Sequence, residues 1–268
     1  MKMQSLMRSA LALSCALAVR TAAASDATIW TVGEPDGRPA GFALAPDGFR
    51  DFLARDFGYE DKFYLVGHSD PATDFPYVLP GPADTWGGTW PTSGWRTHEV
   101  NILFGLDGQP EGDCLLAVDL ADYAKRFPPL VKVSVNGQDA WFRLNDPDDP
   151  TAAGRRYGQQ EPTVDTLSLT GRFERATPRR LEMPLRRGTL RKGGNTVHVT
   201  VLEGSWILFD RVALEGPSSV RPTQSEGLFV RDVAAAPYES DHDGKRVQPL
   251  LVDVEWLGAT PTLSVEID

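Results

Sequence analysis

The residues best suited to chemistry lie in one Gly- and Pro-rich stretch, residues 67–98, where three tryptophans fall within ten positions: Trp86, Trp90 and Trp95. An indole ring offers a flat apolar face to the C–H side of a sugar, and planar polar side chains can hydrogen-bond its hydroxyls. The polar side chains of this stretch are Asp84, Arg96 and His98. These six residues predict a carbohydrate-binding loop. The alternative, and the favoured interpretation of the tryptophans, is that they seal one end of a folded core.

An acidic stretch, residues 145–149, offers a second kind of chemistry. Carboxylate oxygens are preferred ligands of Ca²⁺, and the weak calcium candidates here are Asp146, Asp148 and Asp149. A charged, solvated loop is the alternative and the favoured interpretation. We therefore expect no required cofactor, with a structural calcium ion left open.

Catalytic motifs are missing from the sequence. The four histidines and Cys114 have no zinc-ligand spacing. We find no Gly-rich phosphate loop, no nucleophile elbow and no Ser-His-Asp pattern. A carboxylate pair for glycoside hydrolysis need not be adjacent in sequence, but nothing indicates a specific pair. No catalytic residue is assigned.

Several other polar and aromatic residues have structural interpretations. Those near the last predicted strands of the main domain are Asn195, His198, Glu203 and Asp210. Asn195 is interpreted as a turn residue with left-handed backbone, and Asp210 as an acceptor for loop amides. Trp206 is predicted in the core. Trp141 is predicted in the core or on a sheet face, rather than as a sugar platform.

The N-terminus has the features of a secretory signal, predicted as residues 1–24. Lys2 and Arg8 give a positive start, residues 9–19 form an apolar run of eleven, and residues 22–24 are alanines suited to cleavage. The run is too short to span a bilayer. We therefore expect a secreted or periplasmic protein with no membrane span. Its single remaining cysteine, Cys114, could form no internal disulfide.

Composition and charge narrow the class of partner. The formal net charge of the chain is −10 and its pI is about 4.9. An acidic surface repels phosphate backbones, so we expect no nucleic acid partner. A neutral polysaccharide or oligosaccharide fits this charge. An acidic glycan would need a local basic cleft, and three arginine pairs could supply it: residues 155–156, 179–180 and 186–187. Ordinary solvated turns are the favoured alternative for these pairs.

Short alternating apolar runs separated by turns predict an all-β protein. We expect strands over residues 28–33, 62–66, 99–104, 114–119, 130–135, 140–144, 167–171, 180–185, 196–201 and 206–214. Asn136-Gly137 predicts a two-residue hairpin turn, and the apolar spacing of 47–57 predicts one short helix. The pattern indicates an antiparallel two-sheet jelly-roll sandwich of the galactose-binding-like kind.

The predicted domains follow from these runs. The jelly-roll domain covers 25–215, and Gly- and Pro-containing residues 216–222 form a linker. Residues 223–268 form a C-terminal β segment with strands over 227–233, 247–256 and 262–267. We interpret this segment as the start of an incomplete second domain. The alternative is that it adds strands to the main sheet.

Five stretches in this order carry a family resemblance. They are Trp30-Thr31-Val32-Gly33 with Asp36-Gly37, then residues 74–82 (DFPYVLPGP), Asn136-Gly137, residues 190–195 (LRKGGN) and residues 204–210 (GSWILFD). Over residues 28–215 the chain resembles the C-terminal carbohydrate-binding-like domain of polysaccharide lyase family 4 rhamnogalacturonan lyases. It also resembles related jelly-roll modules of secreted bacterial glycan-degrading proteins.

The resemblance implies an accessory domain, because in that family the lyase chemistry belongs to a separate N-terminal β-sandwich. No position here matches a catalytic residue of that sandwich. The first hypothesis is therefore an exported accessory carbohydrate-binding or scaffolding module of a polysaccharide-degrading system. The second is part of a polysaccharide lyase or glycosidase whose catalytic domain is absent from this chain, so that a catalytic domain or protein is a partner. A spacer without a ligand is the third.

Overall fold

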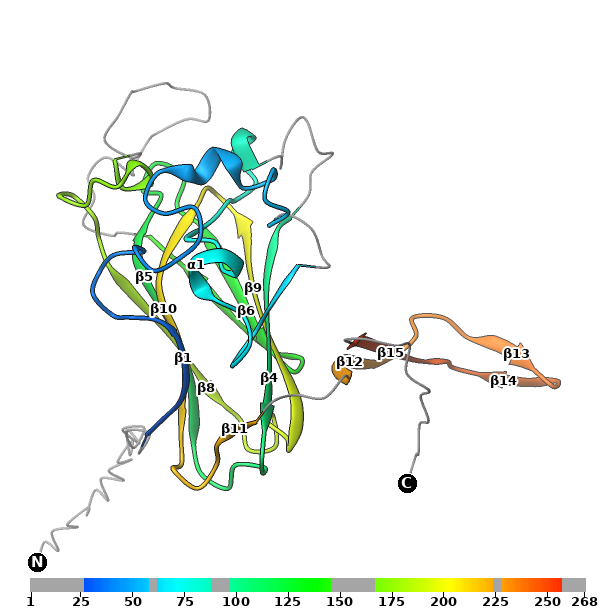
Figure 1. Ribbon diagram of the computed structural model, residues 1–268. Coiled ribbons are helices and arrows are strands. Elements are labelled where there is room, and N and C mark those ends of the chain that lie inside the picture. Colours follow the sequence, from blue (N-terminus) through cyan, green and yellow to red (C-terminus); the bar gives the residue numbers. More distant parts are fainter. Residues whose placement is uncertain (1–26, 58–61, 88–96, 146–166, 224–227, 257–268) are drawn as a thin grey trace, which may run out of the picture.

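Two β-sheets packed face to face form the body of the protein in the computed structural model, which describes residues 27–57, 62–87, 97–145, 167–223 and 228–256 (Figure 1). The first sheet has the order β1 (Ala27–Gly33), β10 (Ile207–Gly216), β5 (Cys114–Tyr123) and β8 (Arg179–Leu185), with β3 (Val78–Leu79) beside β10. The second has the order β11 (Pro222–Thr223), β4 (Glu99–Leu106), β9 (Gly193–Glu203), β6 (Leu130–Val135) and β7 (Gln138–Arg143). β2 (Phe63–Leu65) runs parallel to β4, and the other strands of these two sheets pair antiparallel. The predicted two-sheet sandwich is confirmed.

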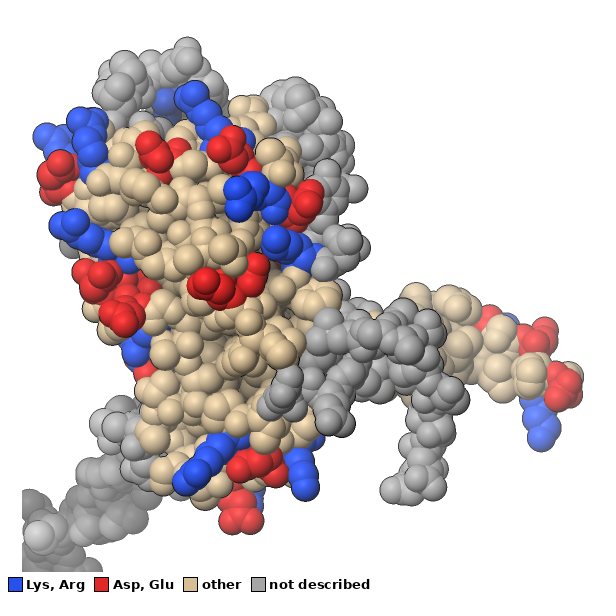
Figure 2. Space-filling view, viewed as in Figure 1, with Lys and Arg blue, Asp and Glu red and all other residues tan. Residues whose placement is uncertain are grey.

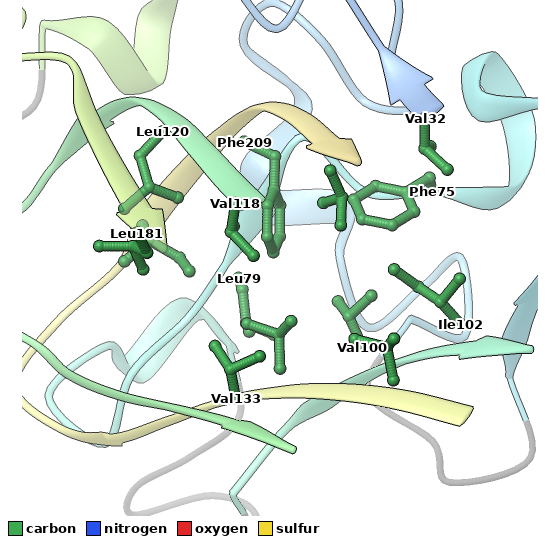
Figure 3. Close-up of a cluster of buried hydrophobic side chains, with 14 of the residues drawn as sticks. Val32, Phe75, Leu79, Val100, Ile102, Val118, Leu120, Val133, Leu181 and Phe209 are labelled. Carbon is green, nitrogen blue, oxygen red and sulfur yellow. The ribbon is translucent and has the colours of Figure 1, made fainter. Parts of the chain in front are cut away.

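The core lies between the sheets because one side of each strand is apolar. In β6, Val131, Val133 and Val135 are buried, whereas the alternate Lys132 and Ser134 are not. Figure 3 shows Val118, Phe209, Leu79 and Val133 pointing into this space. Removing such side chains from water is the main stabilising term of a sandwich.

The hairpin between β6 and β7 confirms the turn predicted at Asn136-Gly137. Asn136 has φ of 47° and Gly137 has φ of 84°, the positive pair that a type I′ turn requires. The strands pair from Val135–Gln138 to Leu130–Arg143 without a shift in register. This turn therefore fixes which β7 residues share a face with which β6 residues.

One prediction of local structure is confirmed only in part, and another is wrong. Residues 47–57 do not form an α-helix; only a 3₁₀ turn, η1 (Gly48–Asp51), is helical, and Asp56 has a φ of 61°, which no helix continues. Residues 167–171 are not a strand but a 3₁₀ turn, η3 (Ser168–Thr170), ended by Gly171 at φ of 77°. Phe52, Phe57 and Leu169 in these two segments are nevertheless buried in the core. The other helical elements are α1 (Pro71–Asp74) and η2 (Thr85–Gly87).

The C-terminal segment forms a separate two-stranded ribbon. β12 (Leu228–Ala235) pairs with β15 (Leu250–Trp256), and β13 (Ser240–His242) pairs with β14 (Lys245–Val247) at the tip, which projects from the sandwich in Figure 1. Neither of these pairs joins a sheet of the sandwich, although β12 lies against β9. The predicted strand 262–267 lies outside the described residues. No helix in the described part of the chain is long and apolar enough to cross a membrane.

The residues predicted as a linker, 216–222, belong to the sandwich. Val220 is buried, and β11 pairs with β4. The backbone N–H of Arg221 donates to Asp107 Oδ1 (2.9 Å), and the N–H of Asp107 donates to the carbonyl of Arg221 (3.1 Å). The sandwich therefore extends to Thr223.

This boundary predicts the behaviour of two shortened chains that both start at Ser25. The chain ending at Thr223 should have a free energy of unfolding about 2 kcal/mol higher than that of the chain ending at Glu215, because only the longer chain buries Val220 and completes β11. Its urea midpoint should be higher accordingly. Equal urea midpoints with equal slopes would show that residues 216–223 are a linker after all.

Candidate functional site

The polar residue that opens the predicted sugar-binding loop is buried and anchors the loop. Asp84 Oδ2 accepts a hydrogen bond from the N–H of Gly81 (2.8 Å), and the hydroxyl of Ser205 donates to Asp84 Oδ1. The N–H of Ala83 donates to the carbonyl of Gly204 (2.9 Å). The carboxylate thus fastens residues 81–84 to the turn between β9 and β10.

Two more members of the predicted loop close the end of the sandwich. Trp86 is half-buried, with its ring edge-on to Phe49 at a centroid distance of 5.0 Å. His98 is buried, its ring lies 5.3 Å from that of Phe52, and its Nε2–H donates to the carbonyl of Gly87. For these residues the geometry is that of the alternative interpretation, a sealed end.

The rest of the predicted site lies in parts of the chain that the structure does not describe. Trp90, Trp95 and Arg96 lie outside the described residues, as do the calcium candidates Asp146, Asp148 and Asp149. Within the described ranges, no group of three His, Cys, Asp or Glu side chains could hold a metal ion.

The outer face of the second sheet divides into a buried half and an open half. On the buried half, where β12 lies against β9, a polar cluster links β4 and β9. His198 Nδ1 lies 2.5 Å from Asn101 Oδ1 and 3.1 Å from Glu99 Oε1. The hydroxyl of Thr200 donates to Glu99 Oε2 (3.2 Å). His198 therefore belongs to this interstrand cluster.

The open half is carried by β6 and β7, and its centre is Trp141, of which 57% is exposed. Trp141 pairs with Lys132, so both side chains are on the outer face. An ion pair lies on each side: Lys132 Nζ is 3.0 Å from Asp139 Oδ2, and Arg143 NH2 is 2.6 Å from Glu203 Oε2. An exposed aromatic ring thus lies beside charged groups that can donate or accept hydrogen bonds, the two kinds of contact that a sugar ring uses.

The exposure of Trp141 was not predicted, although the sequence contains a signal for it. Trp141 is on the sheet face, one of the two places predicted for it, but it is exposed there. The hairpin register set by Asn136-Gly137 pairs residue 141 with Lys132, which lies between two buried valines. That pairing was sufficient to predict an outward indole.

The structural interpretations of Trp206 and Asp210 are confirmed, and that of Asn195 is not. Trp206 is buried, and Asp210 Oδ1 accepts from the N–H groups of Gly37 (3.0 Å) and Arg38 (3.1 Å). Asn195 lies inside β9, where its amide side chain donates to the carbonyls of Arg191 and Gly193, both at 2.9 Å. The left-handed asparagine is Asn136 instead.

Of the arginine pairs considered for an acidic glycan, one member is already paired. Arg180 bonds to Glu182 (2.8 Å), Glu215 (2.9 Å) and Asp119 (3.3 Å) on the outer face of the first sheet. Residues 155–156 lie outside the described residues. Figure 2 shows basic and acidic side chains interspersed on the face in view, rather than one basic patch.

The comparison with protein families decides the identity of the sandwich. The model of polysaccharide lyase family 4, domain III, described as CBM-like, matches residues 28–214. This chain belongs to that family. No curated protein matches the chain. The domain III match runs from β1 into β10, so the family accounts for the sandwich strands up to β10 and leaves β11 and the ribbon outside it.

Two solved structures with a distant likeness to this domain III chain are carbohydrate-binding modules. The family 35 module from an environmental isolate is 10% identical, with a TM-score of 0.29 over 47% of this chain and 71% of its own. CBM35 from Cellvibrio japonicus Abf62 is 17% identical, with a TM-score of 0.26 over 47% of this chain and 70% of its own. Likeness at this level says nothing about a ligand.

Asp210 gives the domain III sandwich a predicted pH dependence. Burial raises the pKa of this carboxyl from 3.8 to about 6, against the lowering effect of the Arg38 and Gly37 N–H groups; the negative charges of Asp36 and Asp119 raise it further. The folded state therefore binds this proton more tightly than the unfolded state. The resulting stabilisation is present below pH 4 and is lost as the pH rises to about 6.

The Asp210→Asn variant keeps an acceptor for the two N–H groups and removes the titration. Its free energy of unfolding, relative to that of the native chain, should rise by about 2 kcal/mol between pH 4 and pH 7. Urea unfolding of both chains across this range measures the difference. A difference that stays constant with pH would mean that Asp210 does not titrate there.

Proposed function

We propose that this chain is an exported accessory module that binds polysaccharide for a glycan-degrading system. Membership of the CBM-like domain III family supports carbohydrate binding. The observation that carries the proposal beyond membership is the open outer face of β6 and β7, where an indole is exposed between two ion pairs. Single exposed apolar residues are common on protein surfaces, so the proposal depends on the indole together with the two ion pairs beside it and not on its exposure alone.

Export is the second part of the proposal and is supported by residues 1–24, which have the charge, apolar run and alanines of a secretory signal. Expression of the full chain in a bacterial host, followed by N-terminal sequencing of extracytoplasmic fractions, tests it. We expect a chain beginning at Ser25. An uncleaved chain retained in the cytoplasm would contradict export.

The family description names a domain of lyases, so the proposal includes a catalytic partner, either a domain on a longer chain or a separate protein. We infer that the residues of this chain bind glycan and bring that partner to it. The chain alone should therefore release no unsaturated uronates, detected by ultraviolet absorbance, from pectic substrates. Release that survives purification would make it an enzyme in its own right.

Native gel electrophoresis through embedded polysaccharide tests binding directly. The chain starting at Ser25 is run through gels containing galactan, arabinogalactan, rhamnogalacturonan, xylan or polygalacturonate, with bovine serum albumin as the unretarded reference. Retardation in at least one of the gels is the expected result. Migration equal to that in the blank gel for all five would contradict glycan binding.

A further inference from the structure

We propose that the open half of the second sheet, on β6, β7 and the end of β9, is a binding surface for neutral pyranose residues. Trp141 is its aromatic platform. This inference rests on the proposed function, since it names the site and the class of sugar for the same activity. The contacts of this face support it in three steps: the direction of the side chains, an apolar stripe, and balanced charge.

The register of the hairpin places Trp141 on the outside. Antiparallel partners share a face, and Trp141 pairs with Lys132 while Ala140 pairs with Val133. Val133 is buried between the sheets, so Trp141 and Lys132 point the opposite way. The indole is held on a hairpin whose turn has the two positive φ angles of a type I′ turn, and this regular hairpin limits the conformational entropy lost when a ligand binds.

Two leucines extend the indole into an apolar stripe. Leu130 pairs with Arg143 and is therefore the diagonal neighbour of Trp141 on the same face. Between the pairs Leu130–Glu203 and Val131–Val201 the register shifts, which leaves Leu202 as the extra residue of a bulge. Leu202 is 36% exposed. The stripe thus runs from Trp141 toward Leu202. The Arg143–Glu203 ion pair spans it at Leu130, because Leu130 lies between these two residues on neighbouring strands.

The charges on either side of the indole cancel. Lys132 is paired with Asp139 at 3.0 Å, and Arg143 is paired with Glu203 at 2.6 Å, so each cation already has its carboxylate. A uronate would have to break one of these pairs and would meet Asp139 or Glu203. Hydroxyl groups can donate to the carboxylates and accept from the cations without breaking a pair. The face therefore favours a neutral sugar.

Replacement of Trp141 is the first arm of the test. The polysaccharide that retards the native chain most is titrated into native chain, Trp141→Ala, Trp141→Phe and Tyr238→Ala by calorimetry. Tyr238 is the matched control, because it is an aromatic on the ribbon with 56% exposure. We expect Trp141→Ala to weaken binding at least tenfold, Trp141→Phe to keep part of the affinity, and Tyr238→Ala to match the native chain. All variants should fold, since both side chains are exposed.

The second arm tests the class of sugar. Binding of a neutral glycan should change less than about twofold between low salt and 0.5 M NaCl, because no net charge is neutralised. Full affinity in Trp141→Ala, or preference for polygalacturonate with a steep salt dependence, would overturn the inference while leaving glycan binding intact. Self-association of the native chain that Trp141→Ala abolishes would overturn it in favour of a protein interface. If the native chain binds no glycan, the proposed function itself fails.

Discussion

Replacement of Gly204 by alanine is expected to lower the free energy of unfolding by about 4 kcal/mol, more than any other substitution considered. Gly204 has a φ of 81°, where an L side chain is strained. A Cβ atom there would lie 2.5 Å from the carbonyl oxygen of Pro128 and 2.6 Å from that of Phe127. Both obstacles are backbone atoms, so the contact cannot be relieved by rotation of a side chain.

A second glycine separates backbone strain from the close contact. Gly188 has a φ of 88°, but a Cβ there meets nothing within 4 Å. Gly188→Ala should therefore lower the free energy of unfolding by only about 1 kcal/mol. Urea unfolding of the two variants gives the comparison. Equal losses would show that the turn at Gly204 moves away from residues 127–128 without cost.

Replacement of Asp84 by alanine is expected to lower the free energy of unfolding by about 3 kcal/mol. The variant removes the buried carboxylate that accepts hydrogen bonds from the N–H of Gly81 and the hydroxyl of Ser205. Buried donors without partners lose the water they had in the unfolded chain and gain nothing in exchange. Thermal and urea unfolding of the variant measure the loss.

Two controls accompany this prediction. Asp84→Asn keeps one acceptor oxygen, so its free energy of unfolding should fall by about half as much as that of Asp84→Ala. Asp113→Ala removes an exposed carboxylate, and its free energy of unfolding should lie within about 0.5 kcal/mol of that of the native chain. If Asp84→Ala were as stable as Asp113→Ala, Asp84 would not anchor the loop, and its carboxylate would be available to a ligand.

The strands could be predicted from the sequence because their signals are local. Alternation of Val131, Val133 and Val135 with polar residues, followed by Asn136-Gly137, determines both a strand and its turn. The same alternation determined the outward direction of Trp141. The extent of the helix within 47–57 and the strand at 167–171 were predicted wrongly, because a few apolar residues in a short segment fit several periods and their burial comes from the surrounding chain.

The roles of Asp84 and His98 could not be predicted, because their partners are distant in sequence or come from irregular segments. Ser205, which donates to Asp84, is 121 positions away, and Phe52, which packs on His98, lies just after the η1 turn. A carboxylate and an imidazole near tryptophans are equally consistent with a sugar site and with a sealed end. Only the tertiary structure distinguishes the two. The C-terminal ribbon was predicted as strands, but its separation from the sandwich depends on long-range pairing in the same way.

The central claim is that Trp141 is the platform on which a sugar ring binds. Its most direct test follows the NMR signals of the seven indole N–H groups in the nitrogen-15-labelled chain while the neutral polysaccharide that retards the chain most in the gels is added. The Trp141→Phe variant identifies the signal of Trp141 by its loss, and the buried Trp30 and Trp206 serve as internal references. The Trp141 signal should shift in proportion to the glycan bound, while the two references stay in place. Binding that leaves the Trp141 signal unmoved and shifts other indoles would contradict the claim.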